Sequence, residues 1–397
     1  MIDEEEIETF VCMFENRLQI QRSWKSRSFK ILDTANWECL QYSPAHLLDF
    51  LLTLVKYSTI PITINLHLQH GRDLKNTVNI MAEIVSIGVH ILDVLGRHVS
   101  EIPPGQGIAL IDEIRITAAG TAAGTSVDLA KLGCKVTSVG AVGNDEMGNI
   151  LIGILDRHGV DTAHIVRKDG VQTSGTVLPI RPNGERPALH VIGSNAAFCY
   201  DDVPEAIIAK ADYVHVGGFY LMPKFDGPDT VRTLRLAKDS GAITTMDILG
   251  VQQENMADKI APCMPYLDYF MPNLEEGGMI TGLSDPDEIC KYFLDAGAKN
   301  VILKMGERGS LLLNSTGGRI RVPAFRVNVV DTTGCGDAWS AGFIAGLSMK
   351  MSVAKAAELG SACGSLVASG LGSDAGIIDL ESTLAFIKTT PTLPLQD

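Results

Sequence analysis

Residues 329–343 read Val329-Val330-Asp331-Thr332-Thr333-Gly334-Cys335-Gly336-Asp337-Ala338-Trp339-Ser340-Ala341-Gly342-Phe343. This pattern predicts a strand end, a glycine-rich turn and a helix whose small residues allow close packing. Because the first amides of a helix lack partners and its dipole is positive there, we expect Gly334, Cys335 and Gly336 to bind an anion. Asp337 would lie in the same field, which should keep its carboxylate ionised. The turn therefore predicts phosphoryl transfer, with Asp337 as general base.

Outward from this turn, strands alternate with helices through most of the chain. Strands are predicted at 83–87, 135–141, 213–216, 242–247 and 300–304, and helices at 125–132, 147–158, 230–240, 338–347 and 353–366. Such alternation is typical of parallel βαβ crossovers, with helices on both faces of one open sheet. We therefore predict a three-layer α/β domain over residues 81–390, with a mostly parallel central sheet.

One segment of this domain departs from the alternation. Residues 174–180 and 186–192 are extended runs joined by a turn that contains Asn183-Gly184, a strong hairpin signal. With an extended run upstream they would form a small antiparallel β lid over about 96–120 and 174–193. A lid excludes water from a site beneath it. Its unpaired edge could also pair with a second copy and form a homodimer.

Both ends of the chain lie outside the predicted domain. Residues 1–80 have an acidic start, a basic patch and two of the three tryptophans. Periodicity predicts helices over 5–21 and 44–56 and a strand over 60–66, so we expect a mainly helical N-terminal extension of unknown role. Residues 391–397 are expected to form a C-terminal tail.

Composition limits the partners and the compartment. The chain has 397 residues, a formal net charge of −14 and eight scattered cysteines without a CxxC pair. So acidic a surface repels phosphate backbones and anionic lipid heads, which argues against nucleic-acid and membrane partners. The cysteine spacing matches neither a disulfide framework nor a metal finger. The acidic N-terminus is unlike a secretory signal, and no apolar run approaches the ~20 residues of a membrane helix, so we expect a soluble cytoplasmic protein.

Several motifs together resemble the ribokinase-like (PfkB) family of carbohydrate kinases. The family signature Asp-Thr-Thr-Gly-Ala-Gly-Asp matches residues 331–337, where only Cys335 differs. Further matching segments follow the family order: Ala119-Gly120, Leu129-Ala130-Lys131-Leu132-Gly133, Gly140 to Gly148, Pro272-Asn273-Leu274-Glu275-Glu276 and Gly306-Glu307-Arg308-Gly309. The resemblance covers about residues 83–385. It implies a ribokinase-like fold and ATP-dependent phosphorylation of a hydroxymethyl group of a sugar or sugar derivative.

The resemblance also implies roles for individual residues around ATP. Asp337 matches the catalytic base, and the anion hole matches Gly334, Cys335 and Gly336. Nucleotide-binding positions match Asn273, Lys304, Gly306, Gly309 and Thr332. Glu276 matches a glutamate that orders water around the Mg²⁺ that accompanies ATP, and Asp331 and Thr333 match positions that hold K⁺ in some members. Lys304 stands where a threonine is frequent, so it could meet a phosphate or point into solvent.

The acceptor end of the site shows both matches and departures. Asp93 occupies the position where the family binds acceptor hydroxyls, and a carboxylate can accept bonds from two of them. Gly120, Thr121 and Gly124 lie in the family's Gly-Gly-x-x-x-Asn motif, but Gly124 replaces its asparagine. That replacement would leave room for a bulkier acceptor or for water. The common Asp-x-Asn-x-Arg is absent, since the chain reads Asp247-Ile248-Leu249-Gly250.

Other interpretations of the same residues stay open. The chain could be a nucleoside kinase of the same family. It could also be a catalytically silent member that binds a sugar or nucleotide and regulates a partner, with residues 1–80 as the docking segment. Asp337 could simply cap a helix. Because family chains normally begin near Met81, residues 1–80 could also be upstream sequence translated from a misplaced start.

Overall fold

The computed structural model describes residues 20–23, 28–31, 63–66, 82–183 and 185–395, in two compact units, Met1–Ile80 and Met81–Asp397. The described parts of the first unit are strands β1 (Ile20–Ser23), β2 (Ser28–Ile31) and β3 (Thr63–Leu66). Strand β2 pairs antiparallel with β1 and parallel with β3.

The first unit was predicted to be mainly helical, but each of its described segments is a strand. The helix predicted over 5–21 is wrong at its end, because Ile20 and Gln21 belong to β1. The rest of that helix and the helix predicted over 44–56 lie outside the described residues. The strand predicted over 60–66 is confirmed at Thr63–Leu66.

A nine-stranded sheet forms the centre of the second unit, in the order β16-β15-β14-β13-β12-β11-β4-β7-β8. Its strands are β4 (Glu83–Gly88), β7 (Lys135–Gly143), β8 (Asp161–Lys168), β11 (Tyr213–Phe219), β12 (Ile243–Ile248), β13 (Tyr269–Phe270), β14 (Asn300–Lys304), β15 (Ser310–Asn314) and β16 (Arg319–Val322). All neighbouring strands from β14 to β8 pair in parallel. Strand β15 pairs antiparallel with both β14 and β16. The predicted, mostly parallel sheet is therefore confirmed.

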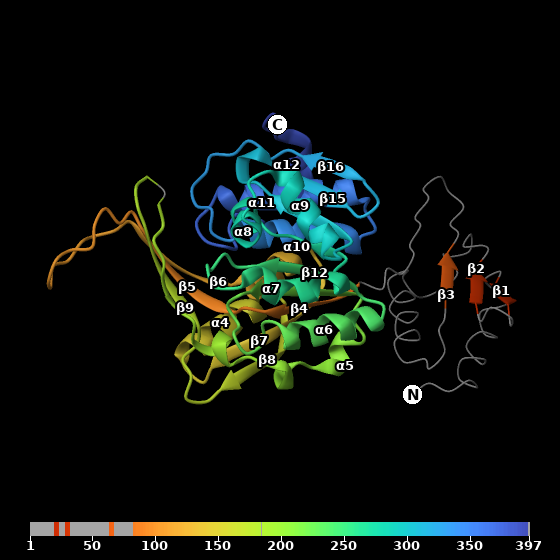
Figure 1. Cartoon of the computed structure of the whole chain (residues 1–397), viewed down its shortest axis with the longest axis horizontal. Helices are drawn as coiled ribbons and strands as arrows, with labels where there is room; N and C mark the ends of the chain where they lie inside the picture. The colour runs from red at the N-terminus through yellow and green to blue at the C-terminus, as the bar shows by residue number, and fades with distance from the viewer. Residues whose placement is uncertain (1–19, 24–27, 32–62, 67–81, 184, 396–397) are drawn as a thin grey trace, which may run out of the picture. The chain divides into compact units, whose positions relative to one another are not determined.

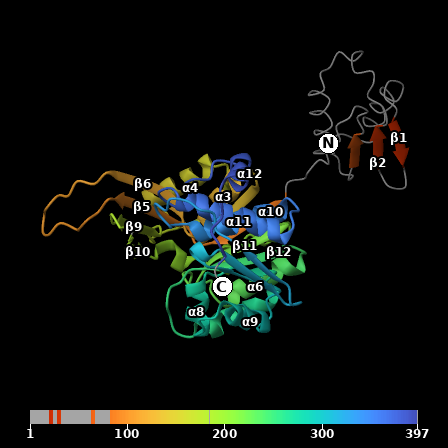
Figure 2. The same cartoon turned by 90° about the horizontal axis from the view of Figure 1, so that it is seen from above.

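Helices cover both faces of this sheet (Figure 2). One layer consists of α3 (Thr121–Lys131), α4 (Glu146–Arg157), α10 (Cys335–Ser348), α11 (Val353–Ala368) and α12 (Leu380–Thr389). The other consists of α5 (Glu205–Ile208), α6 (Pro228–Asp239), α7 (Met256–Ile260), α8 (Leu274–Thr281) and α9 (Pro286–Asp295). Each layer buries its own apolar core, with Val127, Leu151 and Phe343 in the first and Leu234, Phe270 and Phe293 in the second. The three-layer α/β fold is confirmed.

A second sheet of four strands forms the lid, which extends away from the helices in Figure 1. Its order is β10-β9-β5-β6, with β5 (Ile91–Arg97), β6 (Glu113–Ala119), β9 (Gly175–Ile180) and β10 (Leu189–Val191). The β9–β10 hairpin is antiparallel as predicted, but β5 pairs in parallel with β9, so the sheet is mixed. The lid also begins at Ile91 rather than near 96, because only Val89 and His90 separate β5 from β4.

One face of the lid turns toward the body of the domain. Asp93 on β5 lies opposite Thr117 and Thr176, and Thr176 lies opposite His190, which makes one row across all four strands. Because alternate residues of a strand share a face, the row lies on the same side as Leu95, Leu178 and Ile180. These three pack against Leu371 of the loop after α11. The row of Asp93 therefore faces inward.

The packed domain continues beyond the boundary predicted at 390. Thr392 forms an antiparallel bridge with Phe325. The amide of Leu393 donates to the Ala324 carbonyl at 2.8 Å, and the amide of Arg326 donates to the Pro391 carbonyl at 2.9 Å. Residues 391–393 therefore belong to the domain rather than to a tail.

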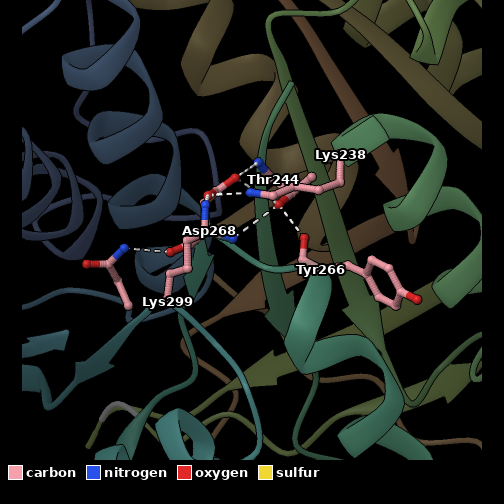
Figure 3. Close-up of polar contacts among 6 residues, drawn as sticks. Lys238, Thr244, Tyr266, Asp268 and Lys299 are labelled. Carbon is pink, nitrogen blue, oxygen red and sulfur yellow. Dashed lines mark hydrogen bonds and ion pairs between the residues drawn. The ribbon is translucent and has the colours of Figure 1, made fainter. Parts of the chain in front are cut away.

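At the amino-terminal edge of the sheet, a carboxylate joins three strand starts (Figure 3). Asp268 Oδ1 accepts hydrogen bonds from Lys238 Nζ at 2.5 Å and Lys299 Nζ at 3.0 Å, and Oδ2 accepts one from the Thr244 amide at 3.0 Å. Burial raises the pKa of Asp268, but the bonds from Lys238, Thr244 and Lys299 outweigh it and bring the pKa below its ordinary value. Asp268 therefore stabilises the fold as a carboxylate.

Replacing this carboxylate is expected to destabilise the fold. Asp268→Asn should lower the free energy of unfolding by about 2 kcal/mol at pH 7, because charge-assisted bonds are lost. Since the folded-state pKa is lowered, this contribution is present above the unfolded pKa and disappears as the pH falls through the folded one. Urea unfolding at pH 7 measures the loss. Asp287→Asn, which breaks an exposed pair with Arg319, is the control and should change stability by less than about 1 kcal/mol. Equal losses would contradict the prediction.

Candidate active site

The carboxyl edge of the central sheet gathers most of the residues predicted for the site. Asp247 lies near the end of β12, Asn273 follows β13, and Lys304 ends β14. Gly306 and Gly309 belong to the turn after β14, where a 3-10 helix spans Gly306–Arg308. Parallel strands place their carboxyl ends at one edge, where open α/β sheets bind ligands.

The glycine turn lies directly before α10, as the sequence predicts, with Gly334 at the helix N-cap. Gly334 adopts φ +77°, and a Cβ there would lie 2.4 Å from Ser373 Cα, so a side chain does not fit. Among the described residues, no backbone acceptor outside the helices and strands takes the amides of Gly334 or Gly336. The Cys335 amide donates to the Thr332 carbonyl at 3.4 Å. The turn thus offers two free amides and a third that is weakly engaged.

Asp337 lies where α10 packs on α3. A Cβ added to Gly124 would lie 3.2 Å from Asp337 Oδ2, and Thr125 Oγ1 donates to the Asp337 carbonyl at 3.3 Å. The space that the sequence predicts beside Gly124, for a bulkier acceptor or water, is therefore bounded by the Asp337 carboxyl itself. What occupies that space stays a prediction, and Asp337 forms one of its walls.

The pKa of Asp337 is raised rather than held low. Burial and then the charge of Asp247 raise it to about 7, against the opposing charge of Lys304. Glu276 and Asp93 raise it further. The expectation that the helix field keeps Asp337 strongly acidic is therefore wrong, because desolvation and nearby carboxylates outweigh a helix dipole. A carboxyl with a pKa near neutrality is the better proton acceptor once it is ionised.

Lys304 is buried and paired. Its Nζ donates to Asp247 Oδ2 at 2.5 Å and lies 3.5 Å from the Gly336 carbonyl. Ser340 Oγ donates to the same Asp247 oxygen at 2.9 Å. The alternative that Lys304 points into solvent is wrong, because the pair with Asp247 holds its charge beside the glycine turn. The ends of β12 and β14 are thereby tied to the first turns of α10.

Glu276 and Asn273 cap α8 together. Asn273 Oδ1 accepts from the Glu276 amide at 2.9 Å, and Glu276 Oε2 accepts from the Asn273 amide at 2.8 Å. This capping box holds the Glu276 carboxyl at the edge of the sheet. Burial and the charge of Asp247 raise the pKa of Glu276 to about 7, although Lys304 opposes them. Three acidic groups, Asp247, Glu276 and Asp337, thus act on one another within one site.

At the other end of the site, two buried oxygens lack hydrogen-bond partners within the described chain: Asp93 Oδ1 and Thr121 Oγ1. Burial raises the pKa of Asp93 to about 6, while a bond from Thr176 lowers it. Gly120 at φ +87° begins α3, and a Cβ there would lie 2.6 Å from the Val89 carbonyl. Since buried polar atoms are almost always paired, such oxygens mark places where a ligand would donate.

Arg186 is a site residue that the sequence reasoning missed. It lies in the lid hairpin, and its NH1 donates to Thr333 Oγ1 at 3.0 Å. Thr333 in turn donates through its amide and hydroxyl to Asp331 Oδ1, at 2.9 and 2.7 Å, and Gly372 donates to Asp331 Oδ2 at 2.9 Å. The lid and the glycine turn are therefore linked. Arg186 could have been identified from its position, because it lies three residues beyond Asn183 in a hairpin that was predicted to form a lid over the site.

Comparison with known proteins identifies the family and the relatives of this chain. Residues 81–379 match the model of the pfkB family carbohydrate kinases. The chain is 30% identical to the ATP-dependent ribose-1-phosphate kinase of Halopiger xanaduensis, over 72% of this chain and 92% of that protein. It is 26% identical to the 2-dehydro-3-deoxygluconokinase of Bacillus subtilis, over 69% of this chain and 88% of that protein.

A solved structure shares the fold. The ribokinase of Arabidopsis thaliana, in complex with ribose and ATP, superposes with a TM-score of 0.68 at 22% identity. The match covers 78% of this chain and 99% of the ribokinase. The order of the family motifs, the confirmed fold and the extent of the match lead to one conclusion. The chain belongs to the pfkB family of carbohydrate kinases and is a phosphotransferase.

Proposed function

We propose that this kinase transfers the γ-phosphoryl group of ATP to a hydroxymethyl group of a sugar or sugar derivative. The observation that carries the proposal is the placement of Asp337, with a pKa of about 7, directly after the free amides of Gly334 and Gly336. A base near neutrality beside two unpaired amides suits removal of an alcohol proton next to a developing negative charge.

In the proposed mechanism, each part of the site has one task. Acceptor hydroxyls donate to Asp93, whose Oδ1 has no other donor among the described residues. Asp337 accepts the proton of the attacking hydroxyl as its oxygen bonds to the γ-phosphorus, while the bond from phosphorus to the ADP oxygen breaks. The amides of Gly334 and Gly336 stabilise the charge on the migrating group. Lys304 holds the turn in place through Asp247 and Gly336.

We propose that the nucleotide lies over the residues that the family resemblance assigns to it: Asn273, Lys304, Gly306, Gly309 and Thr332. Mg²⁺ would accompany ATP and neutralise phosphate charge. The charge of Asp247 raises the pKa of both Glu276 and Asp337, so a cation bound nearby would offset the negative charge that gathers here. Within the described part of the chain, no three His, Cys, Asp or Glu side chains form a metal site. Phosphate oxygens and water would therefore supply most of the Mg²⁺ ligands, and Glu276 would accept hydrogen bonds from the bound water.

The pKa of Asp337 leads to an expected pH profile. Since only the carboxylate accepts a proton, kcat/KM should rise about tenfold per pH unit below pH 7 and level off above it. Asp93, with a pKa of about 6, should steepen the fall below pH 6 because its protonated form binds hydroxyls less well. Initial rates at saturating Mg-ATP from pH 5 to 9 measure the profile. A flat profile across pH 6 to 8 would count against Asp337 as the base.

The proposal is tested by acceptor-dependent ADP formation. The full chain would be assayed with sugars, sugar acids, sugar phosphates and nucleosides, and the phosphorylated position determined by phosphorus NMR. Turnover with sugars or their derivatives supports the proposal, and turnover with nucleosides alone would support the nucleoside-kinase alternative. ATP binding without turnover on any acceptor would instead support a silent regulator.

We also propose a homodimer through the outer face of the lid. The row next to that of Asp93 points outward and consists of Ile116, Val94, Val177 and Leu189. Ile116, Val177 and Leu189 are 46%, 51% and 65% exposed, which is unusual for neighbouring apolar side chains. A second lid would cover them, and sedimentation of the full chain at several concentrations would reveal the dimer.

The remaining expectations about organisation stay predictions. They are K⁺ binding by Asp331 and Thr333, the role of residues 1–80 and the cytoplasmic location. No helix within the described ranges has both the length and the apolar character needed to cross a bilayer. An assay of activity with and without K⁺ would test the cation, and intact mass of the native protein would test whether it begins at Met1.

A further inference from the structure

Arg186 brings a largely unused guanidinium group into the site. Its NH1 donates to Thr333 Oγ1 at 3.0 Å, and its Nε lies 3.9 Å from Asp331 Oδ1, beyond hydrogen-bond range. No other bond to this side chain is present in the described structure, so NH2 and Nε have no acceptor. The side chain is 38% exposed, which leaves these donors accessible to a ligand.

Asp331 does not require this arginine. Its two oxygens already accept three hydrogen bonds, from the Thr333 amide, the Thr333 hydroxyl and the Gly372 amide. An ion pair at 3.9 Å on a partly exposed side chain adds little to stability. Stability of the loop therefore does not explain why the lid presents a cation here.

The place of the charge is informative. Arg186 lowers the pKa of Asp93 in the row that faces the acceptor, and it also acts on Cys335 in the glycine turn. Arg186 therefore lies beside the glycine turn, where it contacts Thr333, and its charge also reaches Asp93. Lys304, a second cation of the site, is already paired with Asp247. Arg186 is thus a cation of the lid whose NH2 and Nε stay available to a bound acceptor.

We infer that Arg186 binds an anionic group of the acceptor, so that the preferred substrates carry a carboxylate or a phosphate besides the hydroxymethyl group that is phosphorylated. This inference rests on the proposed kinase function. The planar guanidinium fork matches both carboxylate and phosphate oxygens, which accept two parallel hydrogen bonds. A neutral sugar of the same size would leave the fork of Arg186 without a partner, while its hydroxyls could still reach Asp93.

Two matched pairs of acceptors test this inference. D-Gluconate is compared with D-sorbitol, which differs in its carboxylate, and D-ribose 1-phosphate with D-ribose, which lacks the phosphate. The wild-type protein should prefer at least one anionic member by roughly tenfold or more in kcat/KM. The pair that shows the preference distinguishes a sugar acid from a sugar phosphate.

Variants at Arg186 separate recognition from a structural role. Arg186→Gln should raise the KM for the preferred anionic acceptor by roughly 10- to 30-fold, which is several times more than its effect on the KM for the neutral partner. Arg186→Lys should fall between, since it keeps the charge and loses the fork. Arg181→Gln is the matched control, because Arg181 lies in the same hairpin and, among the described residues, its side chain pairs with Glu185 alone, at the surface. It should leave both acceptors unchanged.

The outcomes distinguish this inference from the kinase proposal. Equal losses on neutral and anionic acceptors in Arg186→Gln, or no preference in the wild type, would overturn the role of Arg186. If no acceptor is phosphorylated, the kinase proposal fails, and calorimetry with ribose 1-phosphate and gluconate still decides the anion site. Binding that weakens in Arg186→Gln and not in Arg181→Gln would support it, and binding unchanged in both, or absent from the wild type, would refute it.

Discussion

Asp337→Asn is expected to lower kcat by about 10³-fold while the KM for ATP stays within a factor of about three. Asparagine has the same shape and cannot accept a proton, so the site keeps its geometry and loses its base. The measurement is steady-state ADP formation with the best acceptor at pH 8, where the wild-type carboxyl is ionised. A fall of less than about tenfold would show that Asp337 is not the general base.

The same substitution has a second, opposite readout. Because burial raises the folded-state pKa of Asp337 above that of the unfolded chain, its carboxyl reduces stability as the pH rises above the unfolded pKa. Asp337→Asn should therefore unfold at the same or higher urea concentration at pH 8. Asp93→Asn is the companion variant, and it should raise the KM for the acceptor more than it lowers kcat. Loss of activity together with loss of folding in Asp337→Asn would mean that the residue has a structural role.

Gly334→Ala is expected to lower kcat by about 10²-fold or more. A Cβ at this position would lie 2.4 Å from Ser373 Cα, so the turn must shift and its amides would no longer meet the phosphoryl group. The measurement is again ADP formation, with nucleotide affinity followed by calorimetry.

A matched glycine separates this geometric effect from backbone strain. Gly133 has φ +82°, close to the +77° of Gly334, but a Cβ there would meet nothing within 4 Å. Gly133→Ala should therefore lower stability by about 1 kcal/mol through its backbone conformation and leave kcat unchanged. Similar kinetics in the two variants would contradict the assignment of Gly334 to the anion hole.

The parts of this molecule that follow from local sequence were predictable. Alternating apolar runs locate the strands of the central sheet, and the glycine turn with Asp337 lies within one short motif. Helix starts were less accurate: α3 begins at Thr121 rather than 125, because Gly120 caps it directly after β6. A capping glycine with an unusual backbone angle carries no periodic signal.

Contacts between distant residues were not predictable from the motifs. Lys304 pairs with Asp247 across 57 positions, and Gly124 meets Asp337 only because α3 packs on α10. The raised pKa of Asp337 depends on the same neighbours, so a single helix could not predict it. Arg186 reaches Thr333 across 147 positions, and neither residue marks the other in the sequence. A sequence motif therefore identifies the site residues here, but it does not identify the distant residues that contact them in the fold.

The parallel pairing of β5 with β9 also governs when the molecule can assemble. Leu92 pairs with Gly175, so a chain emerging from the ribosome must complete β6, α3, β7, α4 and β8 before this edge finds its neighbour. Such distant pairing is slow to nucleate, and until then the edge of β5 can join another chain. Until β9 has been synthesised, Asp93 on this strand lacks its neighbour Thr176.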